Sequence, residues 1–389
     1  MTLNVLNTLE INDIHQLDQF RSKWWELLAG TPNATFFQTL EWLEVYWEYF
    51  GNDQLLRVLV VGDPEQPIGI LPLVVRSEQR RIGKVQVLTY PLDDWGSFYG
   101  PVSDHPRQTL LAGLNHIKHS DQTWELVDVR GVPSEDIDPA VTSEVMQLAG
   151  FQTRPSVRAE SAVINVSGTW EEYFSQRTSK WRNNYRRWFR RLHEAGTVRY
   201  ERYRPLGEKH SDIDPRWDLY DTCEELAAAS WQGSSTDGTT LSHESIRDFL
   251  RAAHEVACRL GCADVNLLYS NDQPIAFAYN YVLNGNVFGL RIGYDPEISK
   301  LSPGNLIYAL AIEDSFKRGD LVFDLGPGSL EGKRYFCSNF EPIWQYTHYR
   351  PQAVRAQLLK LRDQFQDWWN ATKMMPQGTN QSKTLQVLP

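Results

Sequence analysis

An aspartate at the end of a short apolar run is the first candidate for chemistry in this chain. Asp324 lies in the run 321–325 and is followed by Gly326-Pro327-Gly328. Ahead of that run, Ser302-Pro303-Gly304-Asn305 opens a predicted helix. The free N–H groups and the dipole of such a helix start attract an anion, and Gly304 lets a phosphate approach. The acid and the helix start together predict a ligand crevice at this strand end.

The elements that position these residues follow in a regular order. Two β-rich runs, 274–283 and 286–293, flank Asn284-Gly285, a dipeptide that adopts positive φ at both corners of a tight hairpin. A helix with Ser302 as its N-cap then ends where Lys317-Arg318 precede Gly319. The expected order is strand, hairpin, strand, helix, strand.

A similar order occurs earlier in the chain. The residues around Pro67-Ile68 resemble those around Pro274-Ile275, and 124–131 parallels 321–326 at a similar separation. This duplication predicts an α/β fold (α+β mixed sheets) of two tandem units, each a mixed, mostly antiparallel sheet flanked by helices. The first copy has His105-Pro106-Arg107 where the second has Ser-Pro-Gly. An anionic cofactor is therefore expected in the second copy.

The composition is typical of a globular protein in a reducing compartment. A chain of 389 residues is too long for one ordinary core, and its net charge of −10 argues against general nucleic-acid affinity while leaving local basic patches possible. No apolar run approaches the roughly 20 residues that span a bilayer, and no signal-like segment opens the chain. Four cysteines do not make a disulfide framework. We expect a cytoplasmic protein without membrane contact.

Three residues at helical spacing could converge on a metal ion, namely His254, Cys258 and Cys262. Gly261 should end the helix before the third of them, and free cysteine is commonly a small buried residue. We therefore expect no metal.

In its element order, its Ser302-Pro303-Gly304 segment and its Asp324-Leu325-Gly326-Pro327-Gly328 segment with Lys333, the chain resembles the GNAT acyltransferase superfamily. It is most similar there to duplicated GNAT proteins, the CelD/BcsL-type acetyltransferases and the Fem-type aminoacyltransferases. The resemblance covers residues 1–350 and is strongest over 264–340. It implies an N-terminal GNAT-like unit over 1–166 without a cofactor motif and an acyl-CoA-binding unit over 167–350.

The segment after residue 350 has a pattern of its own. Apolar residues at helical spacing predict a helix over 351–375 that docks on the body or on a partner chain. A flexible tail is expected over 376–389. The oligomeric state is left open.

The resemblance implies roles for the matched residues. Ser302, Pro303, Gly304 and Asn305 match the loop that binds the acyl-CoA pyrophosphate, and Ile292 and Gly293 match the strand edge that polarises the thioester carbonyl. Asp324, Gly326, Gly328 and Lys333 match the acid, glycines and lysine after the next strand. The loop lacks the Arg/Gln-x-x-Gly-x-Gly/Ala form, which leaves open a donor other than acetyl-CoA. Gly332 stands where the family often has an aromatic residue, so the role of Lys333 is open too.

Acyl transfer to an amine needs a free amine, an oxyanion donor and an acid for the departing thiolate. Asp324 is a candidate to accept a proton through water, and Tyr335 or Tyr294 to protonate sulfur. Alternatively, Asp324 is a turn acid and both tyrosines serve packing alone. His243 is a further candidate base, beside Ser242, which is expected to cap the following helix.

Two loops are candidates for binding the acceptor. They contain Asp94, Trp95 and Tyr99 in the first unit, and Trp231 and Gln232 in the second. Aromatic and acidic side chains suit a cationic amine or a sugar, although such segments are often plain loops. We expect the acceptor between the two units.

A predicted helix over 170–195 carries a dense basic stretch around a packing stripe of Phe174, Thr178, Trp181, Tyr185, Trp188 and Leu192. Its cations are Arg177, Lys180, Arg182, Arg186, Arg187, Arg190 and Arg191. They could bind the CoA 3′-phosphate or an anionic substrate, or the tRNA of a Fem-type transfer. They could equally be a solvated face that pairs with acids elsewhere.

The sequence predicts an N-acyltransferase, in the first place an N-acetyltransferase. It would transfer an acyl group from acetyl-CoA or another acyl-CoA to an amine of a small molecule or saccharide, without a metal. The alternatives are a Fem-like transferase that uses aminoacyl-tRNA and a non-catalytic binding module of the same fold.

Overall fold

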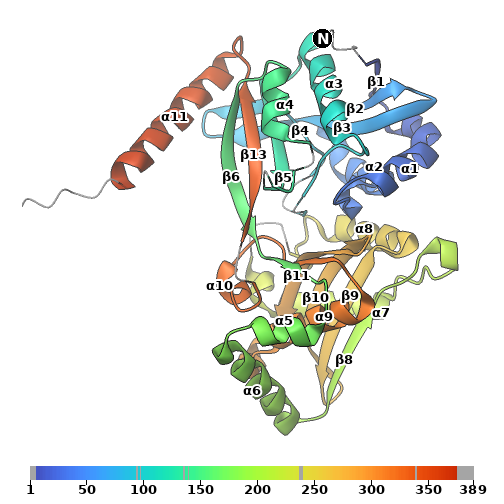
Figure 1. The fold of residues 1–389 in the computed structure, drawn as a ribbon, viewed down its shortest axis with the longest axis vertical. Helices are drawn as coiled ribbons and strands as arrows, with labels where there is room; N and C mark the ends of the chain where they lie inside the picture. Colours follow the sequence, from blue (N-terminus) through green and yellow to red (C-terminus); the bar gives the residue numbers. More distant parts are fainter. Residues whose placement is uncertain are drawn as a thin grey trace, which may run out of the picture.

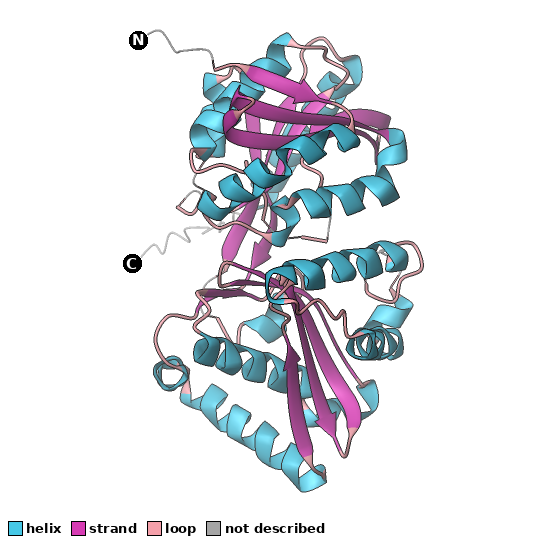
Figure 2. Ribbon diagram, turned by 90° about the vertical axis from the view of Figure 1, so that its right-hand side faces the viewer, coloured by secondary structure: helices cyan, strands magenta, loops and turns pink. Residues whose placement is uncertain are grey.

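The computed structural model describes residues 6–92, 95–96, 98–134, 136–138, 140–235, 240–337 and 340–374. Two mixed sheets lie one above the other, and helices cover the faces of both (Figure 2). The first sheet has seven strands in the order β1-β2-β3-β4-β5-β13-β6. Their bounds are β1 Thr8–Ile11, β2 Gln54–Asp63, β3 Gln66–Arg80, β4 Gly83–Thr89, β5 Leu126–Val132, β13 Glu341–Tyr349 and β6 Thr153–Ser161.

The second sheet has six strands in the order β7-β12-β11-β10-β9-β8. Their bounds are β7 Val163–Asn165, β12 Val322–Asp324, β11 Asn286–Tyr294, β10 Gln273–Leu283, β9 Ala263–Ser270 and β8 Val198–Tyr203. Neighbouring strands are antiparallel except for β4 with β5 and β11 with β12. The two parallel pairs hold equivalent positions in the two sheets, as the duplicated sequence pattern predicts.

The two units exchange strands. The chain leaves the first sheet at Ser161, and β7 then pairs with β12 in the second. It returns at Glu341, where β13 inserts between β5 and β6 of the first sheet (Figure 1). β7, which precedes residue 166, thus belongs to the second sheet, and β13, which precedes residue 350, belongs to the first. The domain boundaries expected at residues 166 and 350 remain predictions.

Helices flank each sheet. In the first unit they are α1 Arg21–Gly30, α2 Leu40–Phe50, α3 Pro106–His119 and α4 Thr142–Leu148. In the second they are α5 Trp170–Gln176, α6 Ser179–Ala195, α7 Trp217–Ala229, α8 Arg247–Leu260, α9 Pro303–Arg318 and the short α10 Leu330–Lys333. The last helix, α11 Val354–Met374, extends away from the body (Figure 1). Among the described helices, none is both long and apolar enough to cross a membrane.

An aromatic core joins the two units. Phe249 of α8 packs against Trp42 and Phe50 of α2 and against Trp95, with ring centroids 4.8–5.3 Å apart. Phe36 contacts Tyr281 of β10 at 4.4 Å. One hydrophobic cluster therefore runs from the first unit into the second and fixes their junction.

Local sequence signals explain several element ends. The predicted hairpin is confirmed, because Asn284 and Gly285 connect β10 to β11 with φ of 49° and 78°. The single helix predicted over 170–195 is wrong, because the chain breaks at Arg177 and the Thr178 hydroxyl accepts from the Trp181 amide to start α6. Ser242 does not cap the following helix either, since α8 begins only at Arg247.

Candidate functional site

A gap opens between β11 and β12. Their parallel pairing covers only three residue pairs and ends at Phe288 opposite Asp324. β11 continues to Tyr294, paired with β10 alone, and its register with β10 shifts between Asn280 and Tyr279. The β11 residues 289–292 are half-buried, whereas most of β9 and β10 is buried. Beyond Phe288, this edge of β11 thus has no ladder partner among the described strands.

Two glycines form the apex of the gap. A Cβ on Gly289 would lie 2.9 Å from the Asp324 carbonyl oxygen. Gly326 has a φ of +75°, and a Cβ there would lie 2.4 Å from the Gly289 carbonyl oxygen. The two backbones touch at these glycines, and the pairing of β12 with β11 ends just before this contact.

The Asp324 carboxylate lies beside this apex and is 1% exposed. Its Oδ1 accepts hydrogen bonds from the Ser161 hydroxyl and, at 2.8 Å, from the Gly326 amide. Burial, together with the negative charge of Asp324, raises the pKa of Tyr308 on α9. Asp324 therefore accepts a hydrogen bond from the turn, as the alternative prediction of a turn acid expects. Its carboxylate also lies at the gap.

Lys333 supplies a buried cation next to the acid. Its Nζ donates to the carbonyl oxygens of Gly326, at 2.5 Å, and Pro327, at 2.9 Å, and the residue is 7% exposed. Burial lowers the pKa of Lys333 to about 8, the Asp324 charge opposes this, and the Arg291 charge adds to it. Arg291 was not among the predicted site residues. The sequence feature that could have identified Arg291 is that it is the single charged residue in the run 286–293.

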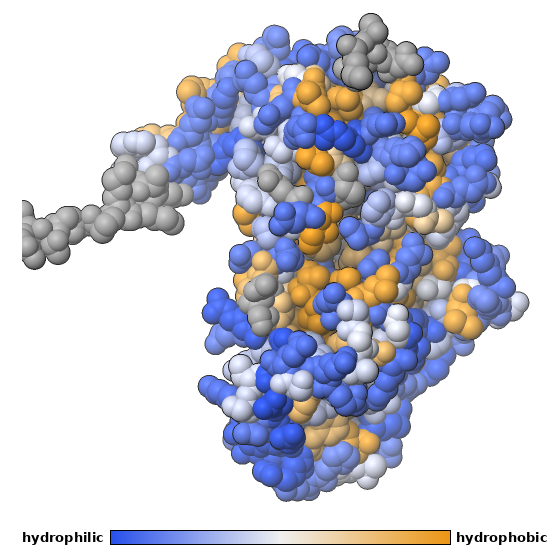
Figure 3. Space-filling view, in the orientation of Figure 1, coloured by the Kyte–Doolittle hydropathy of each residue, from blue (hydrophilic) through white to orange (hydrophobic). Residues whose placement is uncertain are grey.

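A cavity of about 140 Å³ lies where the two units meet, on the Asp324 side of the sheet. Its mostly apolar lining includes Gln38, Tyr99, Pro106 and Ala140 from the first unit, and Val163, Phe288 and Asp324 from the second. Hydrophobic residues also gather on the surface at the level of this junction (Figure 3). Burial raises the pKa of Tyr99, whose Oη has no hydrogen-bond partner among the described residues. The cavity brings together two predicted site residues, Asp324 and Tyr99.

The start of α9 differs from the prediction. Ser302 is left-handed, with a φ of 59°, and its side chain makes no capping bond. The amides of Asn305 and Leu306 donate to the Ser302 carbonyl, and Pro303 has no N–H. Within the described chain, this leaves the Gly304 amide as the open donor of the first turn. The helix start thus offers an anion one amide rather than several.

Gly304 has a packing role as well. A Cβ there would lie 3.0 Å from the Tyr294 ring, so the glycine lets β11 approach the helix start. Tyr294 therefore packs on the candidate phosphate loop rather than beside Asp324.

Three other predicted residues come together on β11. Gln232 lies in the 3-10 turn η5, Trp231–Ser234, and its Nε2 donates to the Ile292 carbonyl at 3.0 Å. A Cβ on Gly293 would lie 3.0 Å from the same Nε2, so the glycine makes room for the amide. The candidate acceptor residue Gln232 thus touches the candidate thioester edge.

The remaining predicted residues lie apart from this site. Tyr335 is 41% exposed and meets Trp188 edge-on. His243 bonds to Ser245 through Nδ1 at 2.8 Å, and Trp95 stacks on Phe50 at 4.5 Å. Asp94 and the side chain of Trp231 lie outside the described residues.

The first unit differs at the equivalent strand end. Asp128 matches Asp324 in the repeat, and Arg130 stands where the second unit has Gly326. The Arg130 guanidinium binds Asp128 at 2.7 Å and Glu78 at 2.7 Å and is 8% exposed. A large buried cation thus stands where the second unit has the glycine that contacts Gly289.

The residues considered for a metal belong to the core. His254 Nε2 bonds to the Pro215 carbonyl at 2.7 Å, and Nδ1 to the Tyr279 hydroxyl at 2.9 Å. Burial lowers the pKa of His254 to about 4. Over the residues that the structure describes, no three His, Cys, Asp or Glu side chains converge as metal ligands would.

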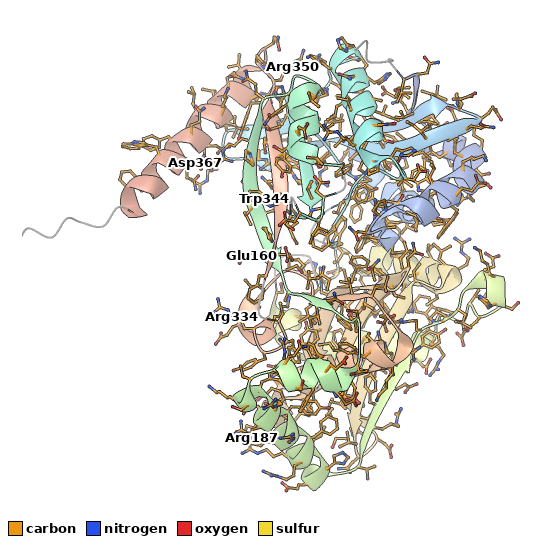
Figure 4. All side chains as sticks on the ribbon, viewed as in Figure 1. Glu160, Arg187, Arg334, Trp344, Arg350 and Asp367 are labelled. Atoms are coloured by element: carbon orange, nitrogen blue, oxygen red, sulfur yellow. The ribbon has the colours of Figure 1, made fainter. Side chains whose placement is uncertain are left out.

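The basic residues of α6 form an exposed surface. Of the seven predicted cations, Arg190 alone has a described carboxylate within 4.0 Å, that of Glu194 at 3.6 Å. Arg177 and Arg182 donate instead to the carbonyls of Phe336 and Ser175. Arg187 projects from α6 at the end of the molecule away from the first unit (Figure 4). Most of this face is exposed to solvent, as one of the predictions has it, and among the described residues no acid outside α6 lies within 4.0 Å of its cations.

Comparison with known proteins agrees with this geometry. Residues 179–335 match the family described as an acetyltransferase (GNAT) domain. The crystal structure of FemX is similar in fold, with a TM-score of 0.59 at 10% identity, over 89% of this chain and 98% of that one. No curated protein matches the sequence significantly.

Two other solved structures have lower scores. The C-terminal domain (DUF2156) of an Agrobacterium fabrum protein has a TM-score of 0.49 at 13% identity, over 75% of this chain and 84% of that one. A tandem GNAT protein from the clavulanic acid biosynthesis pathway has 0.45 at 10% identity, over 90% and 100%. The family match and the FemX likeness confirm the predicted resemblance and fold class.

Proposed function

We propose that this protein, whose residues 179–335 form a GNAT domain in a duplicated GNAT fold, is an acyl-CoA-dependent N-acyltransferase. The observation that carries the proposal is the gap between β11 and β12. Among the described strands β11 has no ladder partner on this side after Phe288, glycines form the apex of the gap, and Asp324 and Lys333 flank it. An acyl thioester is the group that enters such a gap in this superfamily.

The chain's own residues supply the chemistry. The amine attacks the thioester carbonyl, so that a C–N bond forms, the C–S bond breaks and the amine loses a proton. Asp324 would accept that proton through water. Lys333, with a pKa of about 8, is better placed than Tyr335 or Tyr294 to meet the negative charge that develops at the gap.

The acceptor would bind in the cavity between the units. Asp324 lines the cavity, and the apolar lining with Tyr99 and Gln38 suits a small molecule or a sugar that carries an amine. The first unit, which has Arg130 in place of Gly326, would act as a wall of this pocket.

Calorimetry with acetyl-CoA and longer acyl-CoAs tests the donor. Gly304→Asp places a negative charge at the open amide of α9, whereas Gly304→Ala places the same Cβ against Tyr294 without charge. We expect the Asp variant to bind acyl-CoA at least tenfold more weakly than the Ala variant, a difference of about 1.4 kcal/mol. Absence of binding by the wild type to every acyl-CoA would overturn the proposal.

One observation favours a second donor, aminoacyl-tRNA. The exposed cations of α6 have a single described carboxylate partner, so they are open to phosphates. Binding of tRNA that weakens steeply with salt and is lost in Arg186→Glu/Arg190→Glu would support this candidate. The double variant Lys209→Glu/Arg259→Glu makes the same charge change at exposed positions outside α6 and serves as control. Acyl-CoA binding without turnover of any amine would instead favour a non-catalytic binding module.

A further inference from the structure

Helix α11 has one face that is fixed to the body of the molecule. Ala356 and Leu359 are buried against Val85, Val87, Leu126 and Tyr349. Farther along, Asp363 accepts from the Tyr349 hydroxyl at 2.7 Å, and Asp367 forms a two-bond ion pair with Arg154 of β6 at 2.7 and 3.0 Å. These four anchors set which side of the helix points outward, and Asp367 lies on the outlying part of the helix in Figure 4.

The outward side carries an uncovered apolar stripe. Val354, Leu358, Leu361, Phe365 and Trp368 follow one another at alternating spacings of four and three residues and are 52–75% exposed. Trp369 flanks the stripe and is 48% exposed. Alternating four- and three-residue spacing is the seam pattern of helices that pack against another helix. A second helix is therefore a more suitable partner for the stripe than a flat or irregular protein surface.

The area of the stripe is that of a stable interface. Large side chains bury about 150–250 Å² each when fully covered, so the exposed parts of these six amount to on the order of 700 Å² per copy. A standard interface buries about 800 Å² per partner. We propose that α11 pairs with α11 of a second copy of this chain and makes the protein a homodimer.

The charges beside the stripe agree with self-pairing. One flank carries Arg355 and Arg362, and the other carries Gln357 and Gln364. In a parallel pair each arginine flank meets the partner's glutamine flank, so that like charges do not face each other. A membrane-surface helix needs a broad cationic face opposite its apolar side. Here the opposite face is anchored through Asp363 and Asp367.

Sedimentation equilibrium of the full chain tests the proposal. We expect a dimer for the wild type and at least a hundredfold weaker association for Phe365→Glu, because a charge would be buried in the seam. Gln366→Glu introduces the same charge at the next residue, off the stripe, and should associate like the wild type. Equal midpoints of thermal unfolding for both variants, measured at a concentration too low for association, show that the substitutions leave the monomer folded.

Cross-linking gives an independent readout. The four native cysteines are all buried, so Leu361→Cys places a single exposed thiol on the seam. Mild oxidation should link two copies through this thiol and should not link the matched Gln366→Cys variant. A wild type that stays monomeric at its highest soluble concentration, or a dimer that Phe365→Glu leaves intact, overturns the proposal. Monomeric wild type that sediments with vesicles of phosphatidylcholine and phosphatidylserine, and loses this in Phe365→Glu, would overturn it in favour of a membrane surface.

Discussion

A Cβ on Gly326 would lie 2.4 Å from the carbonyl oxygen of Gly289, so β11 and the turn after β12 meet backbone to backbone. This contact decides where the two strands part. It lies next to the last register pair, Phe288 with Asp324, and beyond it β10 is the only described strand that pairs with β11. The gap thus follows from two residues without side chains on adjacent strand ends.

Substitution of Gly326 should therefore be costly. Gly326→Ala places a Cβ in a left-handed conformation, φ +75°, and against a backbone oxygen. We expect a loss of about 2–4 kcal/mol in the free energy of unfolding, measured with urea. Gly332→Ala, which has nothing within 4 Å of the new Cβ, should cost less than about 0.5 kcal/mol or stabilise α10. Equal stability of the two variants would show that the close contact is unnecessary.

The buried amine of Lys333 should make stability depend on pH. Burial and Arg291 lower its pKa from 10.5 to about 8, so between these values the unfolded chain binds more protons than the folded one. The contribution of Lys333 is thus least favourable below pH 8 and improves as the pH rises toward 10.5. Relative to Lys333→Met, the wild type should gain about 3 kcal/mol across this window.

Urea unfolding of both proteins at several pH values measures this difference directly. The same substitution at the exposed Lys300 controls for the loss of a lysine. A wild-type minus Lys333→Met difference that stays constant with pH would mean that the amine is solvated in the folded protein.

Local sequence patterns predict local structure, and the glycines of this chain show how far such predictions extend. Asn284-Gly285 determines its hairpin because positive φ at both positions suits few other residues. Gly289 carried a similar signal, because an isolated glycine in a strand marks a close backbone approach. It was overlooked because its partner, Gly326, is far away in the chain.

Non-local pairing was beyond prediction. The pattern of 343–349 predicts a strand, but its place between β5 and β6 depends on partners such as Asp128, whose Oδ1 accepts from the Thr347 hydroxyl at 2.9 Å. Thr178 was expected to be a packing residue, although its hydroxyl starts a new helix. Both cases depend on contacts that residue type alone does not specify.

A buried ion-pair network at the far end of α9 should be important for stability. Arg202 of β8 binds Asp264 of β9 at 2.7 Å and donates to the Ala311 carbonyl of α9 at 2.9 Å. The two charged side chains are at most 2% exposed. Arg202→Met would leave the Asp264 carboxylate buried without its main partner, so we expect a loss of about 3–5 kcal/mol in unfolding free energy.

A double variant distinguishes the loss of the ion pair from the cost of leaving one buried charge without a partner. Arg202→Met/Asp264→Asn should recover part of the loss, because the uncompensated charge is removed as well. Arg199→Met removes an exposed pair with Glu201 and a cation–π contact with the Tyr269 ring at 3.6 Å, and should change stability by about 1 kcal/mol. A loss for Arg202→Met no larger than for Arg199→Met would contradict the prediction.

Asp324 offers the sharpest test of the proposed chemistry, because its carboxylate both bonds to the turn and faces the cavity. Asp324→Asn keeps an oxygen for the Gly326 amide but cannot accept a proton at neutral pH. If Asp324 is the base, turnover should fall by about 10²–10⁴-fold while acyl-CoA affinity stays the same. Steady-state rates and calorimetry on the same preparations separate the two effects.

Ser161→Ala provides the matched control for Asp324→Asn. It removes the hydroxyl that donates to Oδ1 and leaves the carboxylate in place. Its turnover should fall far less than that of Asp324→Asn, because the carboxylate that accepts the proton remains. The lost hydrogen bond to a charged group, about 1.5–3 kcal/mol, should lower mainly the free energy of unfolding. Wild-type turnover of Asp324→Asn together with reduced stability would assign the carboxylate to the turn alone. In that case the proton acceptor must be sought among the other groups at the cavity, with the Asp138 carboxylate the first to substitute.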